Sequence, residues 1–137
     1  MTPKEYLSQY YWAKKLAESK RDEIKQLETL AEYVSPRTEI GSGGGASDKV
    51  GEITAKIVDE KEKLNRQIEE LMNLREKIKA TISGVNNPAF RQLLTLRYIN
   101  GYTFERIAIE MFYTYKWVCV LHGRALAAFE VPEKKST

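Results

Sequence analysis

The sequence predicts an all-α protein, with two long helices followed by three short ones. Apolar residues recur at three- and four-residue spacing along most of the chain, and no segment alternates as a half-buried strand does. Hydrophobic residues make up 42% and charged residues 30% of the 137 positions, with only 4 Pro and 8 Gly. This composition is typical of a helical globular protein.

The first long helix is expected to begin at the N-terminus and to end before Pro36. Thr2 and Glu5 form a capping box, and Pro3 suits the first helical turn. The apolar or small residues then follow one seam: Tyr6, Tyr10, Ala13, Ala17, Ile24, Leu27, Ala31 and Val34. The aromatic cluster at residues 10–12 is interpreted as part of an interface.

A glycine-rich segment separates the two long helices. Residues 36–47 are expected to form a disordered loop, because such a composition is flexible. It is not interpreted as a phosphate-binding loop, because no strand precedes it and no Gly-Lys-Ser/Thr ending follows. The second long helix is expected from Ser47 to Ile82, with this apolar seam: Val50, Ile53, Ile57, Leu64, Ile68, Leu71, Ile78 and Ile82.

Residues 1–84 are therefore expected to form a long antiparallel helical hairpin of coiled-coil type. Its seams are too narrow to enclose a compact core, so the hairpin is also expected to join copies of the chain into a homo-oligomer. The pattern leaves open whether the hairpin closes within one chain or swaps between chains, and it does not give the number of subunits.

Residues 86–130 carry the spacing of a helix-turn-helix domain with three helices. Asn87, Thr103 and Thr114 are expected to cap the helices, and Asn100-Gly101 to end the first of them. The predicted core comprises Phe90, Leu93, Leu94, Leu96, Tyr98, Ile99, Ile107, Met111, Val118, Leu121 and Leu126. Residues 131–137 are expected to be a frayed tail.

The turn of this motif is expected between Met111 and Thr114. Ala108 must be small because the next helix crosses over it, while Ile107, Val118 and Leu121 face inward. Phe112 stands where such turns usually hold glycine, so it must take the turn conformation with a side chain attached. The usual role of the second helix is to enter the major groove of DNA.

The candidate DNA contacts lie on and beside this second helix. Base or sugar contacts are expected from Thr114, Tyr115, Lys116, Cys119, Val120 and Gly123, and phosphate contacts from Arg91, Arg97, Arg106, His122 and Arg124. Lys116 is the only basic residue of the groove-facing set, which also lacks the Arg, Asn or Gln of bidentate base contacts. Trp117 is interpreted as a core or interface residue.

Composition argues against several other classes of protein. Cys119 is the single cysteine, and His122 lies one turn away from it. A metal site would need at least a third ligand, which the sequence does not offer nearby. No catalytic residue, metal or cofactor is therefore expected. No apolar run approaches the roughly 20 residues of a membrane span. The N-terminal residues lack the apolar core of a signal peptide, which favours the cytoplasm. The net charge of +3 is compatible with a nucleic-acid partner.

The C-terminal region resembles region 4 of the sigma-70 family. The similarity lies in residues 96–101, in Ile107-Ala108 and in residues 124–126. The whole chain is similar to prophage-encoded late-gene transcription regulators of the RinA/ArpU type. This resemblance implies a non-enzymatic phage regulator, an activator of late genes in the bacterial cytoplasm, with double-stranded DNA and RNA polymerase as partners.

Two alternatives remain open from the sequence. A phage terminase small subunit also joins a helix-turn-helix to oligomerising helices, and it binds packaging-site DNA as a ring. Alternatively, the apolar second helix binds protein and the motif serves as an interaction module without DNA. The sequence does not give the DNA target, nor does it separate activation from repression.

Overall fold

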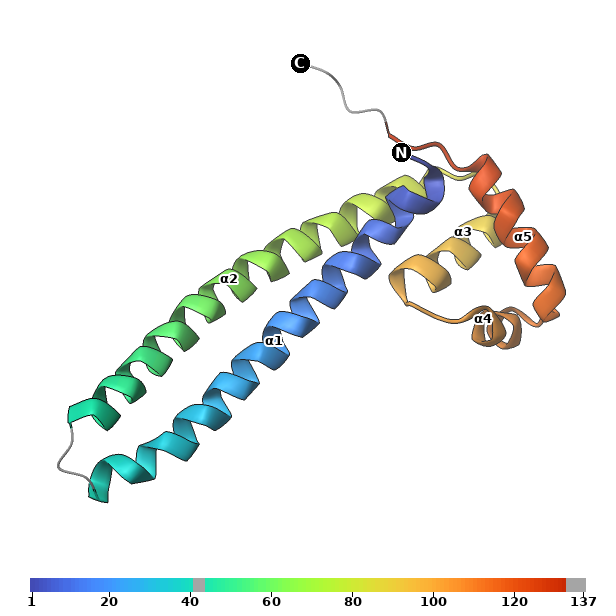
Figure 1. Ribbon diagram of the computed structural model, residues 1–137. Helices are drawn as coiled ribbons and strands as arrows, with labels where there is room; N and C mark the ends of the chain where they lie inside the picture. The colour runs from blue at the N-terminus through green and yellow to red at the C-terminus, as the bar shows by residue number, and fades with distance from the viewer. Residues whose placement is uncertain (41–43, 133–137) are drawn as a thin grey trace, which may run out of the picture. The chain divides into compact units, whose positions relative to one another are not determined.

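The computed structural model describes residues 1–40 and 44–132, with side chains outside 35–47, and these residues contain helices and no strand (Figure 1). The elements are α1 (Pro3–Ile40), α2 (Gly44–Ser83), α3 (Pro88–Leu94), the π-helical turn η1 (Thr95–Ile99), α4 (Phe104–Met111) and α5 (Tyr115–Ala128). The predicted all-α class is confirmed.

The chain divides into two compact units, and both long helices contribute to each of them. Unit 1 comprises residues 1–13 and 71–137, and unit 2 comprises residues 14–70. The sequence pattern predicts a boundary near residue 85, at the end of the second long helix. The structure instead groups the first turns of α1 and the last turns of α2 with the three short helices.

One hydrophobic core explains this grouping in unit 1. Its buried members come from both parts of the chain: Tyr6, Leu7, Ile78, Ile82, Val85, Leu93, Leu94, Tyr98, Ile99, Ile107, Ala108, Val118, Leu121, Ala125 and Phe129. The ring of Tyr6 lies 5.8 Å from that of Phe129, and its hydroxyl is 3.1 Å from the hydroxyl of Thr81. Three short helices alone would leave this apolar surface exposed to water.

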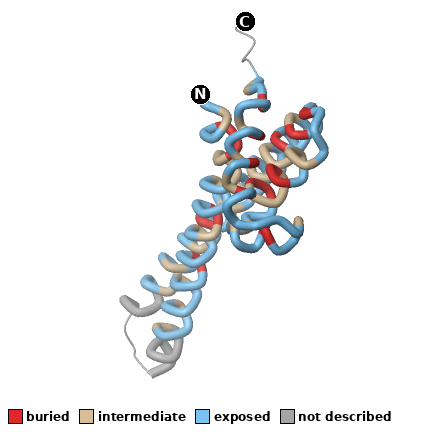
Figure 2. Tube along the Cα trace, turned by 90° about the vertical axis from the view of Figure 1, so that its right-hand side faces the viewer, coloured by how far each residue is buried: buried red, intermediate tan, exposed pale blue. Residues whose placement is uncertain are grey.

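In unit 2, α1 and α2 run antiparallel side by side (Figure 1). Most of the predicted seam residues face inward, and Ala17 and Ile24 are buried there, but Ile68 of the second seam is 40% exposed. Figure 2 shows that few positions along this unit are fully buried. Leu16, Leu30 and Val58 are 66%, 47% and 54% exposed, because two helices cover only one stripe of each other's surface.

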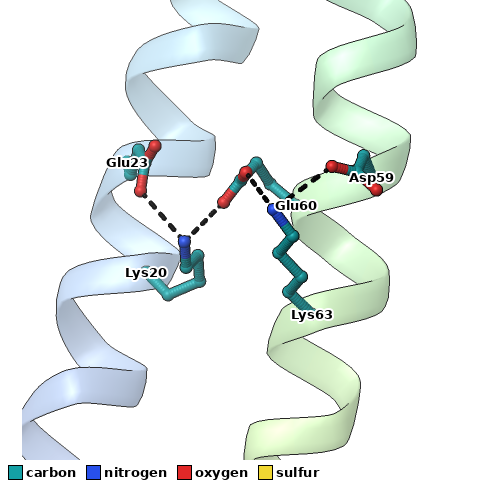
Figure 3. A network of polar contacts seen from close by, with 5 residues as sticks. All are labelled: Lys20, Glu23, Asp59, Glu60 and Lys63. Atoms are coloured by element: carbon teal, nitrogen blue, oxygen red, sulfur yellow. Dashed lines mark hydrogen bonds and ion pairs between the residues drawn. The ribbon is translucent and has the colours of Figure 1, made fainter.

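A partly buried ion pair joins the two helices of unit 2 (Figure 3). The Lys20 ammonium donates to Glu60 at 2.5 Å, Glu23 accepts from it at 3.4 Å, and Lys63 approaches Glu60 and Asp59 at 3.4 and 3.3 Å. The bond from Lys20 lowers the pKa of Glu60, and the same bond raises the pKa of Lys20. A polar pair inside an apolar seam favours one register over neighbouring ones.

The segment between the long helices is shorter than the sequence predicts. Residues 36–47 were expected to form a loop, but α1 extends to Ile40 and α2 begins at Gly44. The remaining residues, 41–43, lie outside the described part of the chain, as do residues 133–137 of the expected frayed tail.

The third helix differs from the continuous helix expected between Pro88 and Ile99. Asn87 caps α3 as predicted, because its side-chain oxygen accepts from the backbone of Ala89 and Phe90 at 2.9 and 3.3 Å. From Thr95 the helix widens into η1, and the amide of Asn100 bonds to the carbonyl of Thr95 at 3.0 Å. Such π turns recur near functional positions.

Candidate nucleic-acid interface

Threonine caps begin both helices of the predicted motif. The Thr103 hydroxyl accepts from the Arg106 amide at 3.2 Å at the start of α4. The Thr114 hydroxyl accepts from the Trp117 amide at 3.1 Å at the start of α5. Each cap satisfies an amide that the first helical turn leaves unpaired. Thr114 therefore lies where it was predicted, and its hydroxyl has a structural role.

The turn between α4 and α5 is built around a left-handed phenylalanine. Phe112 has a φ of 58°, as its position in the sequence predicted, at a cost of about 1 kcal/mol for a side chain in this region. Its amide bonds to the carbonyl of Ile109 at 3.3 Å, and the amide of Tyr113 bonds to the carbonyl of Ala108 at 2.9 Å. This pair of bonds is a Schellman motif, which turns the chain sharply into α5.

The crossing of α4 and α5 is tightly closed. Ile107 and Val118 have no exposed surface, Ala108 is 7% exposed and Leu121 is 6% exposed. Met111 is half-buried at the edge of the same cluster. The five core positions predicted for the motif therefore lie together, and the small Ala108 allows α5 to approach α4.

The opposite face of α5 is open to solvent. Tyr115, Lys116, Val120 and Gly123 are exposed, and Cys119 is half-buried beside them. A hydrogen bond with Cys119 raises the pKa of the Tyr115 hydroxyl. The structure thus brings the predicted base-contact residues onto one helix face. Trp117 lies at the side of this face, 39% exposed, with the Arg124 guanidinium 5.2 Å from its ring centre.

Arg106 is held by an aromatic neighbour that the sequence analysis did not single out. Its guanidinium lies 3.7 Å from the ring centre of Tyr102, and it also donates to the Tyr102 hydroxyl at 3.1 Å. Arg106 itself is exposed. Tyr102 precedes the N-cap of α4, so helical spacing gave no signal for this contact. A stacked arginine loses less freedom when it binds a phosphate.

Two other predicted phosphate contacts have partners inside unit 1. Arg91 donates to the carbonyls of Val85 and Asn86 at 2.6 and 3.1 Å, which fixes the connection before α3. Arg97 donates to the carbonyl of Tyr102 at 3.0 Å and lies 4.4 Å from the ring centre of Phe104. Both side chains therefore stabilise loops of the fold.

His122, a predicted phosphate contact, has partners inside unit 1. Its Nε2 lies 2.7 Å from the Tyr98 hydroxyl, and its ring centre lies 4.9 Å from that of Phe104. Burial, with Arg97 and Lys4 nearby, lowers the pKa of His122 to about 4. The half-buried ring is therefore neutral at pH 7, which disfavours a charged contact with phosphate.

This burial makes the stability of unit 1 dependent on pH. The folded pKa of about 4 lies below the ordinary 6.5, so the unfolded chain binds more protons between these values. We expect the free energy of unfolding to be unaffected by His122 protonation above about pH 6.5. It should decrease as the pH drops from 6.5 toward 4. His122→Gln keeps a hydrogen-bonding group but cannot titrate. Urea unfolding at pH 7 and pH 5 should show a smaller loss of stability for this variant; equal losses would contradict the assignment.

Charge is distributed unevenly along the chain. Unit 1 contains 11 Lys and Arg against 6 Asp and Glu, a formal charge of +5, whereas unit 2 contains 11 against 13, a charge of −2. The positive excess therefore belongs to the unit that holds the helix-turn-helix. Among the described residues, no cluster of three or more His, Cys, Asp or Glu side chains could hold a metal ion. In the same part of the chain, no helix combines the length and the apolar character that crossing a membrane requires.

These features define an all-α protein whose exposed motif is a helix-turn-helix. The chain belongs to the family described as protein of unknown function DUF1492, whose model matches residues 34–120. That match covers the end of α1, the whole of α2, α3, η1 and α4, and the first turns of α5. No curated protein and no solved structure matches the chain.

Proposed function

We propose that this chain is a DNA-binding transcription regulator that inserts α5 into the major groove. The observation that carries the proposal is the geometry of α4, its turn and α5. The Schellman turn at Phe112 and the close crossing at Ala108 leave one full face of a capped helix exposed. A helix in this setting is the usual reading element of a helix-turn-helix.

The charge of unit 1 supports a polyanionic partner. Lys116 is exposed in the first turn of α5, Arg124 lies toward its other end, and Arg106 lies on α4. A net charge of +5 on this unit favours approach to DNA and makes binding dependent on salt, because phosphate contacts release counterions.

The exposed face of α5 favours contact by shape over hydrogen bonding to bases. Val120 can meet a thymine methyl group, whereas bidentate recognition needs side chains that this face lacks. Gly123 leaves the helix backbone bare there, and a Cβ atom at this position would meet nothing within 4 Å. Glycine costs about 1 kcal/mol relative to alanine inside a helix. No neighbouring atom of the chain requires a glycine at position 123. The exposed backbone there therefore supports close approach of a partner.

The biological setting follows from the resemblance. Similarity to sigma-70 region 4 and to RinA/ArpU-type regulators supports a role in activating late phage genes in the bacterial cytoplasm, with RNA polymerase as a second partner. The exposed apolar residues of unit 2, such as Leu16 and Val58, support a homo-oligomer through the long helices. In this proposal unit 1 binds promoter DNA and unit 2 brings copies together.

Lys116→Ala should weaken binding to duplex DNA more than Lys61→Ala. Both lysines are exposed, but Lys116 lies on α5 and Lys61 lies on α2 in unit 2. Loss of one phosphate or groove contact costs roughly 1–3 kcal/mol at most and lowers the salt slope by about one. The measurement is a fluorescence anisotropy titration at several salt concentrations. Equal affinities and slopes for the two variants would remove α5 from the DNA interface.

The same titration tests the alternative of a protein-binding motif. The specific observation in its favour is that Tyr115, Trp117 and Val120 are 51%, 39% and 40% exposed around a single lysine. Aromatic and aliphatic side chains of this kind are enriched at protein interfaces. Wild-type protein without salt-dependent affinity for generic duplex DNA would favour this second function.

A further inference from the structure

The two most exposed large apolar residues of unit 1 lie on α4 and its turn. Phe112 is 95% exposed and Ile109 is 75% exposed, and they are three residues apart. Glu105 lies one turn before Ile109 and Glu110 directly follows it, and both are exposed. We call these four residues the α4 patch. It is apolar at its centre and acidic at its border, which disfavours contact with DNA.

The backbone at Phe112 suggests that this side chain is used outside the chain. Its φ of 58° is a conformation that glycine adopts without strain and phenylalanine does not. A buried phenylalanine could offset that strain by packing, but this one contacts almost nothing in its own chain. Backbone strain that no packing within the chain offsets is typical of functional positions. An exposed aromatic on a rigid turn is also the typical anchor of a protein interface.

A complementary surface exists in unit 1 itself. A cavity of about 400 Å³ lies where the end of α2 meets α3 and η1. Ile82, Pro88 and Leu96 contribute apolar lining. Positive charge comes from Lys79, which lies 3.9 Å from Glu76, and from Arg91, which also donates to two backbone carbonyls. We call this cavity the α2–α3 pocket. Its apolar lining and basic residues are the counterpart of the apolar centre and acidic border of the α4 patch.

We propose that the α4 patch of one copy docks into the α2–α3 pocket of a second copy, with Phe112 as the anchor. The patch and the pocket are different surfaces, so the contact either closes as a reciprocal pair or continues from copy to copy into a ring or filament. The proposal does not depend on DNA binding, and it differs from association through unit 2. One aromatic anchor with a charged border gives a weak contact that needs high protein concentration.

Phe112→Gly separates the two roles of this residue. Glycine removes the anchor and also relieves the left-handed strain, so the variant should melt at a higher temperature and associate less. Phe112→Ala removes the same anchor without relieving the strain. Sedimentation velocity of the full chain over a range of concentrations should show that both variants raise the dissociation constant by roughly tenfold or more. Association through unit 2 contributes equally to wild type and to both variants, so a fall in association in the variants is assigned to the loss of the Phe112 side chain.

Charge reversal tests the pocket. Lys79→Glu should weaken the same association, and so should Glu105→Lys with Glu110→Lys in an otherwise wild-type chain, because each change removes the charge match between the α4 patch and the α2–α3 pocket. If Phe112→Gly and Phe112→Ala associate as strongly as wild type, the proposal is overturned. Loss in Phe112→Gly without any effect of Lys79→Glu would overturn the pocket as the docking surface.

Discussion

Ala108→Leu is expected to unfold the helix-turn-helix and to abolish DNA binding. The Ala108 methyl lies in the closed crossing of α4 and α5, at 7% exposure, beside the fully buried Ile107 and Val118. The interior has no room for three more carbon atoms, and overpacking costs about 1–3 kcal/mol. The carbonyl of Ala108 also accepts the Tyr113 amide, so a shift of α4 disturbs the turn as well.

The control for this experiment is Ala127→Leu. Ala127 is exposed on the last turn of α5, so a larger side chain there meets solvent. Thermal melting by circular dichroism and a DNA titration should show a wild-type-like control and a destabilised Ala108→Leu protein, with the helices of unit 2 retained. A stable Ala108→Leu protein that binds DNA would mean that α5 does not use this crossing, and the DNA-binding proposal would fall with it.

Local features of the fold were predictable from the sequence because their causes are local. The caps at Thr103 and Thr114 need only a hydroxyl and the next turn of helix. The left-handed Phe112 followed from the spacing between Ala108 and the next helix. The inward seams of α1 and α2 followed from three- and four-residue periodicity, which fixes the buried side of a helix without reference to its partner.

Features that depend on partners distant in the sequence were not predictable in the same way. Periodicity places His122 on α5 but does not reveal Tyr98, 24 residues earlier, as its hydrogen-bond partner. The widening of α3 into η1 also leaves no clear signal in composition. In the candidate interface the exposed face of α5 was predicted from helical spacing. The stacking of Arg106 on Tyr102 was not, because Tyr102 lies before the N-cap of α4 and outside the helical pattern.

The division of the chain into two units is the clearest feature that depends on contacts between distant parts of the sequence. The sequence assigns Tyr6 and Ile78 to the long hairpin, because they continue its seams without a break. In the structure the same seams meet the short helices at one end, and their apolar residues complete the core of unit 1. A helical seam shows that a face is buried but does not identify what covers each turn. The helix-turn-helix is therefore expected to need residues 1–13 in order to fold.

Leu7→Ala tests this dependence and should have the largest effect of any single truncation in α1. Leu7 has no exposed surface and lies in the same core as Ile107 and Val118. A buried leucine replaced by alanine costs about 2–5 kcal/mol, through lost apolar contact and the cavity left behind.

Leu16→Ala is the matched control, because Leu16 is 66% exposed and its loss should change stability by about 0.5 kcal/mol or less at low protein concentration. Urea unfolding, followed by a DNA titration of each variant, should show that Leu7→Ala loses both stability and DNA affinity although it lies about 100 residues from α5. Equal stabilities of the two variants would show that the helix-turn-helix folds without the N-terminal helix, as the boundary near residue 85 implied.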